Sequence, residues 1–203
     1  MKRQWFPLTL AALVVVIALL WWKPWQTGGE PLQVFGPAAD FELEHVDGRQ
    51  VKLSDFEGKA RLVYFFFSYC PDVCPPTTAM LARVQENLKK EGLFGERAVI
   101  FSISFDPERD TPERLKEFSG VFGADPAGWL FLRGDEAYIQ NLARDGYKIA
   151  IIKDSAGNFM HQNYIVLVDP EGQIRKWYNV GDPEASAETV IAEITRDMKR
   201  LAS

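Results

Sequence analysis

The chain has 203 residues, which is enough for one domain of ordinary size and a short appendage. Its formal net charge is -5 at pH 7 and its pI is about 5.2. Because no basic stripe occurs anywhere in the sequence, a nucleic-acid partner is excluded.

Residues 1–23 are expected to form a transmembrane anchor. Residues 5–22 carry no charge, and as a helix they would extend about 27 Å, close to the ~30 Å thickness of the bilayer hydrocarbon. Lys2 and Arg3 precede this segment, so the positive-inside rule places the N-terminus in the cytoplasm. A cleaved signal peptide is the alternative, but no small-x-small cleavage site follows the apolar run.

This orientation makes the protein single-pass in the cytoplasmic (inner) membrane. Residues 24–37 are rich in Pro and Gly and are expected to be a linker. Residues 38–203 would then fold as a domain on the extracytoplasmic (periplasmic) side, where thiols tend to be oxidised and a reductant or a ligand is needed to keep them as thiolates.

The domain is expected to begin with a β-hairpin. Residues 41–53 alternate apolar and polar on both sides of Asp47-Gly48, a favoured two-residue turn. His45 has the same phase as the apolar residues Phe41 and Leu43, so we interpret it as a half-buried strand residue and not as a metal ligand.

The two cysteines of the sequence lie between a predicted strand and a predicted helix. Residues 62–67 are six consecutive apolar residues, a pattern typical of a strand covered on both faces. Pro75 disfavours helical geometry at Cys74 and suits a first helical turn, so Cys74 lies at or next to the N-cap, with Cys70 in the loop before it. The positive end of the helix dipole lowers thiol pKa values and favours the thiolate, the form that attacks disulfides and binds metals. The alternative is a structural disulfide or two buried free cysteines.

The elements that follow alternate between strands and helices. In chain order they are a helix at 76–91, a strand at 98–105, a helix capped by Thr111 and extending to 122, a strand at 129–132, a helix at 135–144, an extended segment at 147–152, a polar loop at 153–162, a hairpin at 164–178 and a helix at 187–201. This order predicts a thioredoxin-like α/β domain with an N-terminal β-hairpin extension, preceded by one transmembrane helix. A Cys-x-x-x-Cys after the first core strand occupies the place of the redox site in that fold class.

Two further places are candidates for the site. Asp106 and Asp110 follow the second buried strand, at the end where α/β folds place functional groups, and are candidates for supporting it. His161 lies in the predicted polar loop, which could fold over the cysteines. Two thiolates and one imidazole form a soft trigonal set suited to copper, Cu(I) in particular, because structural zinc normally has a fourth ligand.

Three motifs together resemble the Sco/SenC family. They are Phe-Ser-Tyr-Cys-Pro-Asp-Val-Cys-Pro-Pro-Thr at 67–77, Ser-Phe-Asp-Pro-Glu-Arg-Asp-Thr-Pro-Glu-Arg-Leu-Lys-Glu-Phe at 104–118, and His161 shortly before Tyr-Ile-Val-Leu-Val-Asp-Pro-Glu-Gly at 164–172. The family's members are membrane-anchored, thioredoxin-like copper proteins that help assemble the Cu(A) centre of cytochrome c oxidase. The resemblance covers about residues 37–200.

The resemblance implies the site residues and the cargo. It maps the family's copper ligands onto Cys70, Cys74 and His161, for copper as Cu(I), Cu(II) or both. The sequence departs from many relatives at Tyr69, where they have histidine. It also departs beside His161, where Met160 and Gln162 replace aspartate and serine; these changes leave the ligands intact but alter their surroundings.

The function that the resemblance implies is that of a copper metallochaperone and not of an enzyme. Its partners would be the Cu(A)-bearing subunit of cytochrome c oxidase, other copper chaperones or thiol reductants, and the membrane through the N-terminal helix. The alternative is a thiol-disulfide oxidoreductase that keeps the oxidase cysteines reduced, with Cys70 and Cys74 as its redox-active pair and no need for a histidine. A redox or copper sensor is a third possibility that the sequence leaves open.

Overall fold

Eight strands form one mixed sheet in the computed structural model, which describes residues 32–155, 157–182 and 184–202. In spatial order they are β1 (Gly36–Pro37), β10 (Gln173–Asn179), β9 (Tyr164–Val168), β4 (Ala60–Phe66), β5 (Ala98–Ser104), β6 (Trp129–Arg133), β2 (Glu42–His45) and β3 (Gln50–Lys52). Strands β4, β5 and β6 are parallel, whereas β9 pairs antiparallel with β4.

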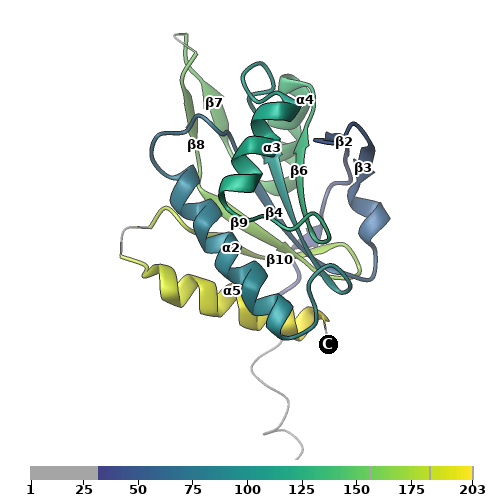
Figure 1. Cartoon of the computed structure of the whole chain (residues 1–203). Helices are drawn as coiled ribbons and strands as arrows, with labels where there is room; N and C mark the ends of the chain where they lie inside the picture. The colour runs from purple at the N-terminus through teal and green to yellow at the C-terminus, as the bar shows by residue number, and fades with distance from the viewer. Residues whose placement is uncertain (1–31, 156, 183, 203) are drawn as a thin grey trace, which may run out of the picture. The chain divides into compact units, whose positions relative to one another are not determined.

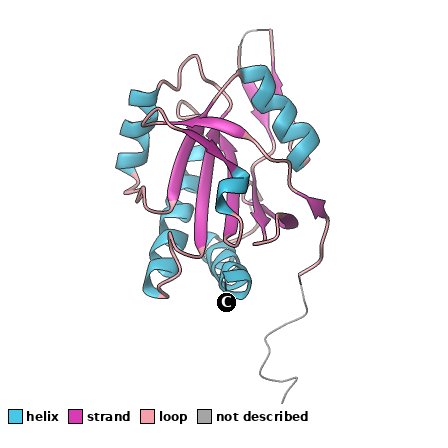
Figure 2. Cartoon of the chain, turned by 90° about the vertical axis from the view of Figure 1, so that its right-hand side faces the viewer, coloured by secondary structure: helices cyan, strands magenta, loops and turns pink. Residues whose placement is uncertain are grey.

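The helices lie on both faces of this sheet (Figures 1 and 2). They are η1 (Leu53–Phe56), α2 (Cys74–Lys90), α3 (Pro112–Val121), α4 (Glu136–Asn141), the π-helical turn η2 (Leu142–Gly146) and α5 (Ala187–Ala202). The crossovers β4–α2–β5 and β5–α3–β6 step in the same direction, and right-handed crossovers therefore place α2 and α3 on the same face. Helix α5 packs beside α2 (Figure 1).

Strand β4 is the centre of the core, and all its residues are buried. On the face covered by α3, the ring of Phe66 lies 5.4 Å from that of Phe118. On the opposite face, the ring of Phe65 lies 5.4 Å from that of Tyr147, which follows η2. A strand covered on both faces needs a continuous apolar run, and this explains why the sequence pattern at 62–67 identified it.

The order β10-β9-β4-β5, with α2 and α5, gives the thioredoxin-like arrangement that the element order predicted. The predicted N-terminal hairpin is confirmed as the antiparallel pair β2 and β3. Thr111 is the predicted N-cap of α3, and its hydroxyl accepts a hydrogen bond from the Arg114 N–H at 3.2 Å. The anchor expected at 1–23 lies outside the described residues. Among the helices that the structure describes, none combines the length and apolar character needed to cross a bilayer.

The prediction of a polar loop at 153–162 is wrong, because part of this segment forms strands. Strand β7 (Ile151–Lys153) pairs antiparallel with β8 (Phe159–His161) in a separate two-stranded sheet, which projects from the domain at the top of Figure 1. The turn between them is closed by Asp154, whose carboxylate accepts hydrogen bonds from both the backbone and the side chain of Asn158. Each of these strands has three residues, which is too short for alternation to reveal it in the sequence.

Two glycines provide a matched test of packing in this fold. A Cβ on the buried Gly128 would lie 2.8 Å from the backbone nitrogen of Gly95, whereas a Cβ on Gly120, in α3, would have nothing within 4 Å. We expect Gly128→Ala to lower the free energy of unfolding by about 1–3 kcal/mol through overpacking. Gly120→Ala should raise the free energy of unfolding by about 0.4–1 kcal/mol, because alanine lowers the conformational entropy of the unfolded chain at this position. Urea unfolding followed by circular dichroism measures both, and equal effects would contradict the tight approach at Gly128.

Candidate metal centre

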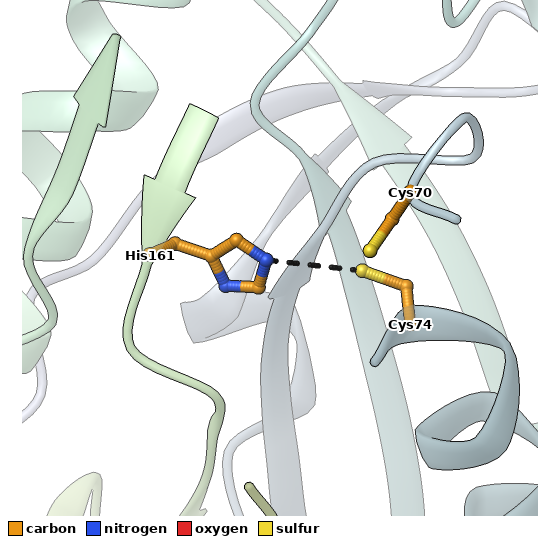
Figure 3. A group of neighbouring side chains, drawn as sticks. All are labelled: Cys70, Cys74 and His161. Carbon is orange, nitrogen blue, oxygen red and sulfur yellow. Dashed lines mark hydrogen bonds between the residues drawn. The ribbon is translucent and has the colours of Figure 1, made fainter. Parts of the chain in front are cut away.

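Three side chains from separate parts of the chain point toward one another (Figure 3). The ligand atoms of Cys70, Cys74 and His161 all lie within 4.8 Å of one another, and Nε2 of His161 is 3.9 Å from the Sγ of Cys74. Both cysteines are free thiols, exposed by 7% and 0% respectively, and His161 is half-buried. The structure thus brings together the three residues that the sequence singled out.

Cys74 is fixed by the start of α2. It is the first residue of the helix, with Val73 as the N-cap and Pro75 in the first turn, as the position of the prolines predicted. Its backbone carbonyl accepts the Thr78 hydroxyl at 2.7 Å, and its side chain is turned into the core. Helix geometry therefore determines where this sulfur lies.

Cys70 lies in the loop between β4 and α2, four residues before Cys74. Its backbone N–H donates to the Phe67 carbonyl at 3.3 Å. The next two residues, Pro71 and Asp72, are exposed. Cys70 is therefore the thiol nearer to solvent, and Cys74 is the more deeply buried one.

The pKa values of the two thiols are shifted in opposite directions. A hydrogen bond from the Cys74 thiol lowers the pKa of Cys70 to about 3, and His161 acts in the same direction, against the effect of burial. Contact with Cys70 raises the pKa of Cys74, and burial adds to this rise. The metal-free pair therefore carries one thiolate, located on Cys70, and one thiol.

His161 is held on β8 rather than in a loop. Its Nδ1 lies 3.3 Å from the Gln162 carbonyl oxygen, an acceptor to which Nδ1 can donate when it carries the proton of a metal-bound imidazole. The other nitrogen, Nε2, faces Cys74 (Figure 3). Histidine ligands commonly donate one nitrogen to a carbonyl in this way while the other binds the metal.

An aromatic cluster supports the imidazole, and the sequence analysis did not identify it. The His161 ring centroid lies 5.1 Å from that of Phe105 and 6.1 Å from that of Phe67. Phe159, two residues earlier on the same strand, lies 5.0 Å from Phe105 and 5.6 Å from Phe67. The spacing of Phe159 and His161 is the strand period of two, which is the one signal that could have indicated a common face.

The other candidates lie outside this group. His45 is a buried strand residue of β2, as interpreted, and its Nδ1 is 2.9 Å from the Asp47 carboxylate. Asp106 pairs with Arg109, and Asp110 accepts hydrogen bonds from Ser68. Among the residues that the structure describes, Cys70, Cys74 and His161 form the one group of three potential ligands.

The donor set determines what this group can bind. Donors at the usual ~2.0–2.3 Å from one ion lie about 3.5–4 Å from one another, and the observed separations approach this range. Two sulfurs with one imidazole are a soft set, which favours copper over magnesium or calcium. The same two sulfurs can also form a disulfide when oxidised.

Comparisons with known proteins agree on one family. A family model described as SCO1/SenC matches residues 33–199. The SCO1 protein homolog of Bacillus subtilis (strain 168) is 35% identical over 142 residues, which is 68% of this chain and 72% of that relative.

Solved structures of family members have the same fold. BsSco, described as a member of the Sco family of cytochrome c oxidase assembly proteins with a disulfide switch, is 30% identical, with a TM-score of 0.72; the match covers 86% of this chain and 98% of that chain. Copper-bound ScoI of Arabidopsis thaliana is 26% identical, with a TM-score of 0.66, over 80% of this chain and 98% of that chain.

The acidity of the thiol pair can be tested by alkylation of the reduced, metal-free protein. Because its pKa is about 3, Cys70 should react with iodoacetamide at a nearly constant rate between pH 5 and 8. An ordinary thiol reacts about tenfold faster for each pH unit in this range, since the thiolate is the nucleophile. Mass spectrometry of quenched samples identifies the modified residue, and the urea-unfolded protein is the control. A rate at Cys70 that rises as in the unfolded chain would contradict the assignment.

Proposed function

The chain belongs to the SCO1/SenC family, and we propose that it is a copper metallochaperone that assists assembly of the Cu(A) centre of cytochrome c oxidase. The observation that carries the proposal is the convergence of two sulfurs and one imidazole nitrogen within 4.8 Å. Copper is bound in ScoI of Arabidopsis thaliana, and BsSco is described among oxidase assembly proteins. Copper is the cargo in this proposal, with Cys70, Cys74 and His161 as its ligands.

The three donors have different roles in holding and releasing copper. The Cys70 thiolate is present before copper arrives and is the more accessible sulfur, so it is the natural first contact for an incoming ion. Cys74 loses its proton when it binds, because a metal requires the thiolate. His161 is the neutral donor, and its replacement by a thiolate of the receiving protein would begin transfer by ligand exchange.

The proposal includes the membrane as a tether. The uncharged segment 5–22 would anchor the chain in the cytoplasmic membrane, and the Pro- and Gly-rich residues after it would link it to the domain. The domain begins earlier than the expected residue 38, because β1 (Gly36–Pro37) pairs with β10. The domain would then act on the extracytoplasmic side, where it could reach the Cu(A)-bearing subunit. Copper donors and thiol reductants on that side would be its other partners.

A second candidate function uses the same pair of sulfurs. The thiolate on Cys70, adjacent to a protonated Cys74, is the arrangement of a thiol-disulfide oxidoreductase, in which the exposed sulfur attacks and the buried one completes the disulfide. BsSco is described as having a disulfide switch. This function would keep the oxidase cysteines reduced so that they can receive copper, and it does not require His161.

Copper titration of the reduced protein tests the first function. We expect one equivalent of Cu(I) or Cu(II) per wild-type chain. Loss of a hydrogen bond that supports a metal ligand typically lowers metal affinity by about 10–100-fold. His161→Ala removes a ligand itself, so it should weaken copper binding by at least this factor. His45→Gln is the matched control, since His45 is bound to Asp47 outside the group, and its affinity should equal that of the wild type. If His161→Ala and wild type bind both copper ions equally, the three-ligand site is refuted.

Reduction of a peptide disulfide separates the two functions. If the oxidoreductase activity is the working one, His161→Ala should retain the wild-type rate, whereas Cys70→Ser and Cys74→Ser should each abolish turnover. The rate is followed by release of the peptide thiols in the presence of a reductant such as dithiothreitol. A wild-type rate no faster than that of Cys70→Ser would count against the oxidoreductase and leave copper binding as the use of the pair.

A further inference from the structure

We propose that Asp110 and Arg114 are positioning residues that hold the segment before Cys70 and so set the copper affinity and the disulfide stability of the cysteine pair. The part of this inference that concerns copper rests on the proposed function. The part that concerns the disulfide depends only on the two cysteines.

Asp110 binds Ser68, which lies two residues after the end of β4, at the start of the loop that carries Cys70. Its carboxylate is 0% exposed and accepts hydrogen bonds from the Ser68 backbone N–H at 3.0 Å and the Ser68 hydroxyl at 2.5 Å. It also accepts one from the Ser104 hydroxyl. All three partners are donors, so the position requires a group that only accepts.

Arg114 holds the same segment from α3. Its Nε donates to the Ser68 hydroxyl oxygen at 2.9 Å, and its terminal nitrogen donates to the Ser68 carbonyl at 3.3 Å. The guanidinium lies 4.8 Å from the ring centroid of Tyr69, a side chain that is 51% exposed. Arg109 lies 5.6 Å from the same ring and 5.6 Å from that of Phe67. Each of the three residues that precede Cys70 is therefore held by a residue at 109–114.

Cys70 depends on this support more than the other two donors do. Cys74 is placed by a 17-residue helix, and His161 by its strand and the aromatic cluster. Cys70 has one backbone hydrogen bond within its loop, at 3.3 Å, followed by two exposed residues. The sulfur of Cys70 has further contacts with the Cys74 thiol, with His161 and with the backbone of Asp72 and Cys74, all of which lie on its C-terminal side. Ser68 and Tyr69 are therefore the support of Cys70 on its N-terminal side, and a change there moves the Cys70 backbone.

A purely structural role for Asp110 is the competing explanation, because removing any buried hydrogen-bonded carboxylate destabilises a protein. Asp197 offers a matched control. It is also 0% exposed, and it accepts hydrogen bonds from the Tyr178 hydroxyl and from Lys176 between α5 and β10. Asp197→Asn removes comparable hydrogen bonding without touching the cysteine loop.

The test uses Asp110→Asn, in which an NH₂ group replaces one acceptor oxygen and faces donors. The full-length, copper-free protein is equilibrated with reduced and oxidised dithiothreitol. Reduced dithiothreitol converts the Cys70–Cys74 disulfide to two thiols and itself becomes the cyclic disulfide, so electrons and protons balance. Trapping with iodoacetamide and mass spectrometry gives the fraction reduced. We expect the equilibrium to shift about tenfold toward the dithiol in Asp110→Asn, because a displaced Cys70 meets the geometry of the disulfide less well.

Arg114→Gln and Ser68→Ala should shift the equilibrium in the same direction, and Asp197→Asn should leave it at the wild-type value. Copper titration of the same reduced proteins should show an affinity lowered by about 10–100-fold in Asp110→Asn, Arg114→Gln and Ser68→Ala. The copper affinity of Asp197→Asn should equal that of the wild type. An unchanged dithiol fraction in folded Asp110→Asn would overturn the proposal, as would an equal shift in Asp197→Asn. If the wild type binds no copper but the disulfide equilibrium shifts as expected, the copper function fails while the positioning role stands.

Discussion

The site depends on how a strand buried on both faces ends at the start of a helix. Strand β4 cannot move within the sheet, because β5 and β9 pair with it on either side and aromatic rings cover both faces. Helix α2 cannot shift along its axis without losing its contacts with α5. The connection between them therefore has a fixed start and a fixed end, and the two cysteines lie within it.

This constraint explains why the thiols differ although they are only four residues apart. Cys74 is part of the helix and faces the core, where its hydrogen bond to Cys70 and its burial both raise its pKa. Cys70 precedes the helix, accepts a hydrogen bond from Cys74 and is nearer to solvent, so it holds the negative charge. With one thiolate and one thiol, the pair avoids the free-energy cost of burying two adjacent negative charges. Two thiolates side by side would need a bound cation to offset that cost.

The sequence identified the parts of the site that local chemistry determines. An apolar run of six residues and the proline that follows Cys74 were enough to place β4, α2 and Cys74, because each signal acts within one turn or one strand. The structure places His161 beside the two cysteines, as the hypothesis of a shared site required, but the strand that carries it was not predicted. The hairpin of β7 and β8 is defined by pairing and by packing of Phe159 on Phe105, and such contacts between distant segments leave almost no periodic pattern.

The three donors are held by three different kinds of interaction, and this suits a site that must release its cargo. Helix geometry fixes Cys74, hydrogen bonds between the segment at 109–114 and Ser68 restrain the approach to Cys70, and the rings of Phe67 and Phe105 support His161. Because these supports share few residues, one donor can leave while the other two stay in place. A site in which all ligands came from one rigid element would bind at least as tightly, but an incoming thiolate would have to displace them together. Separate supports therefore favour stepwise exchange over permanent binding.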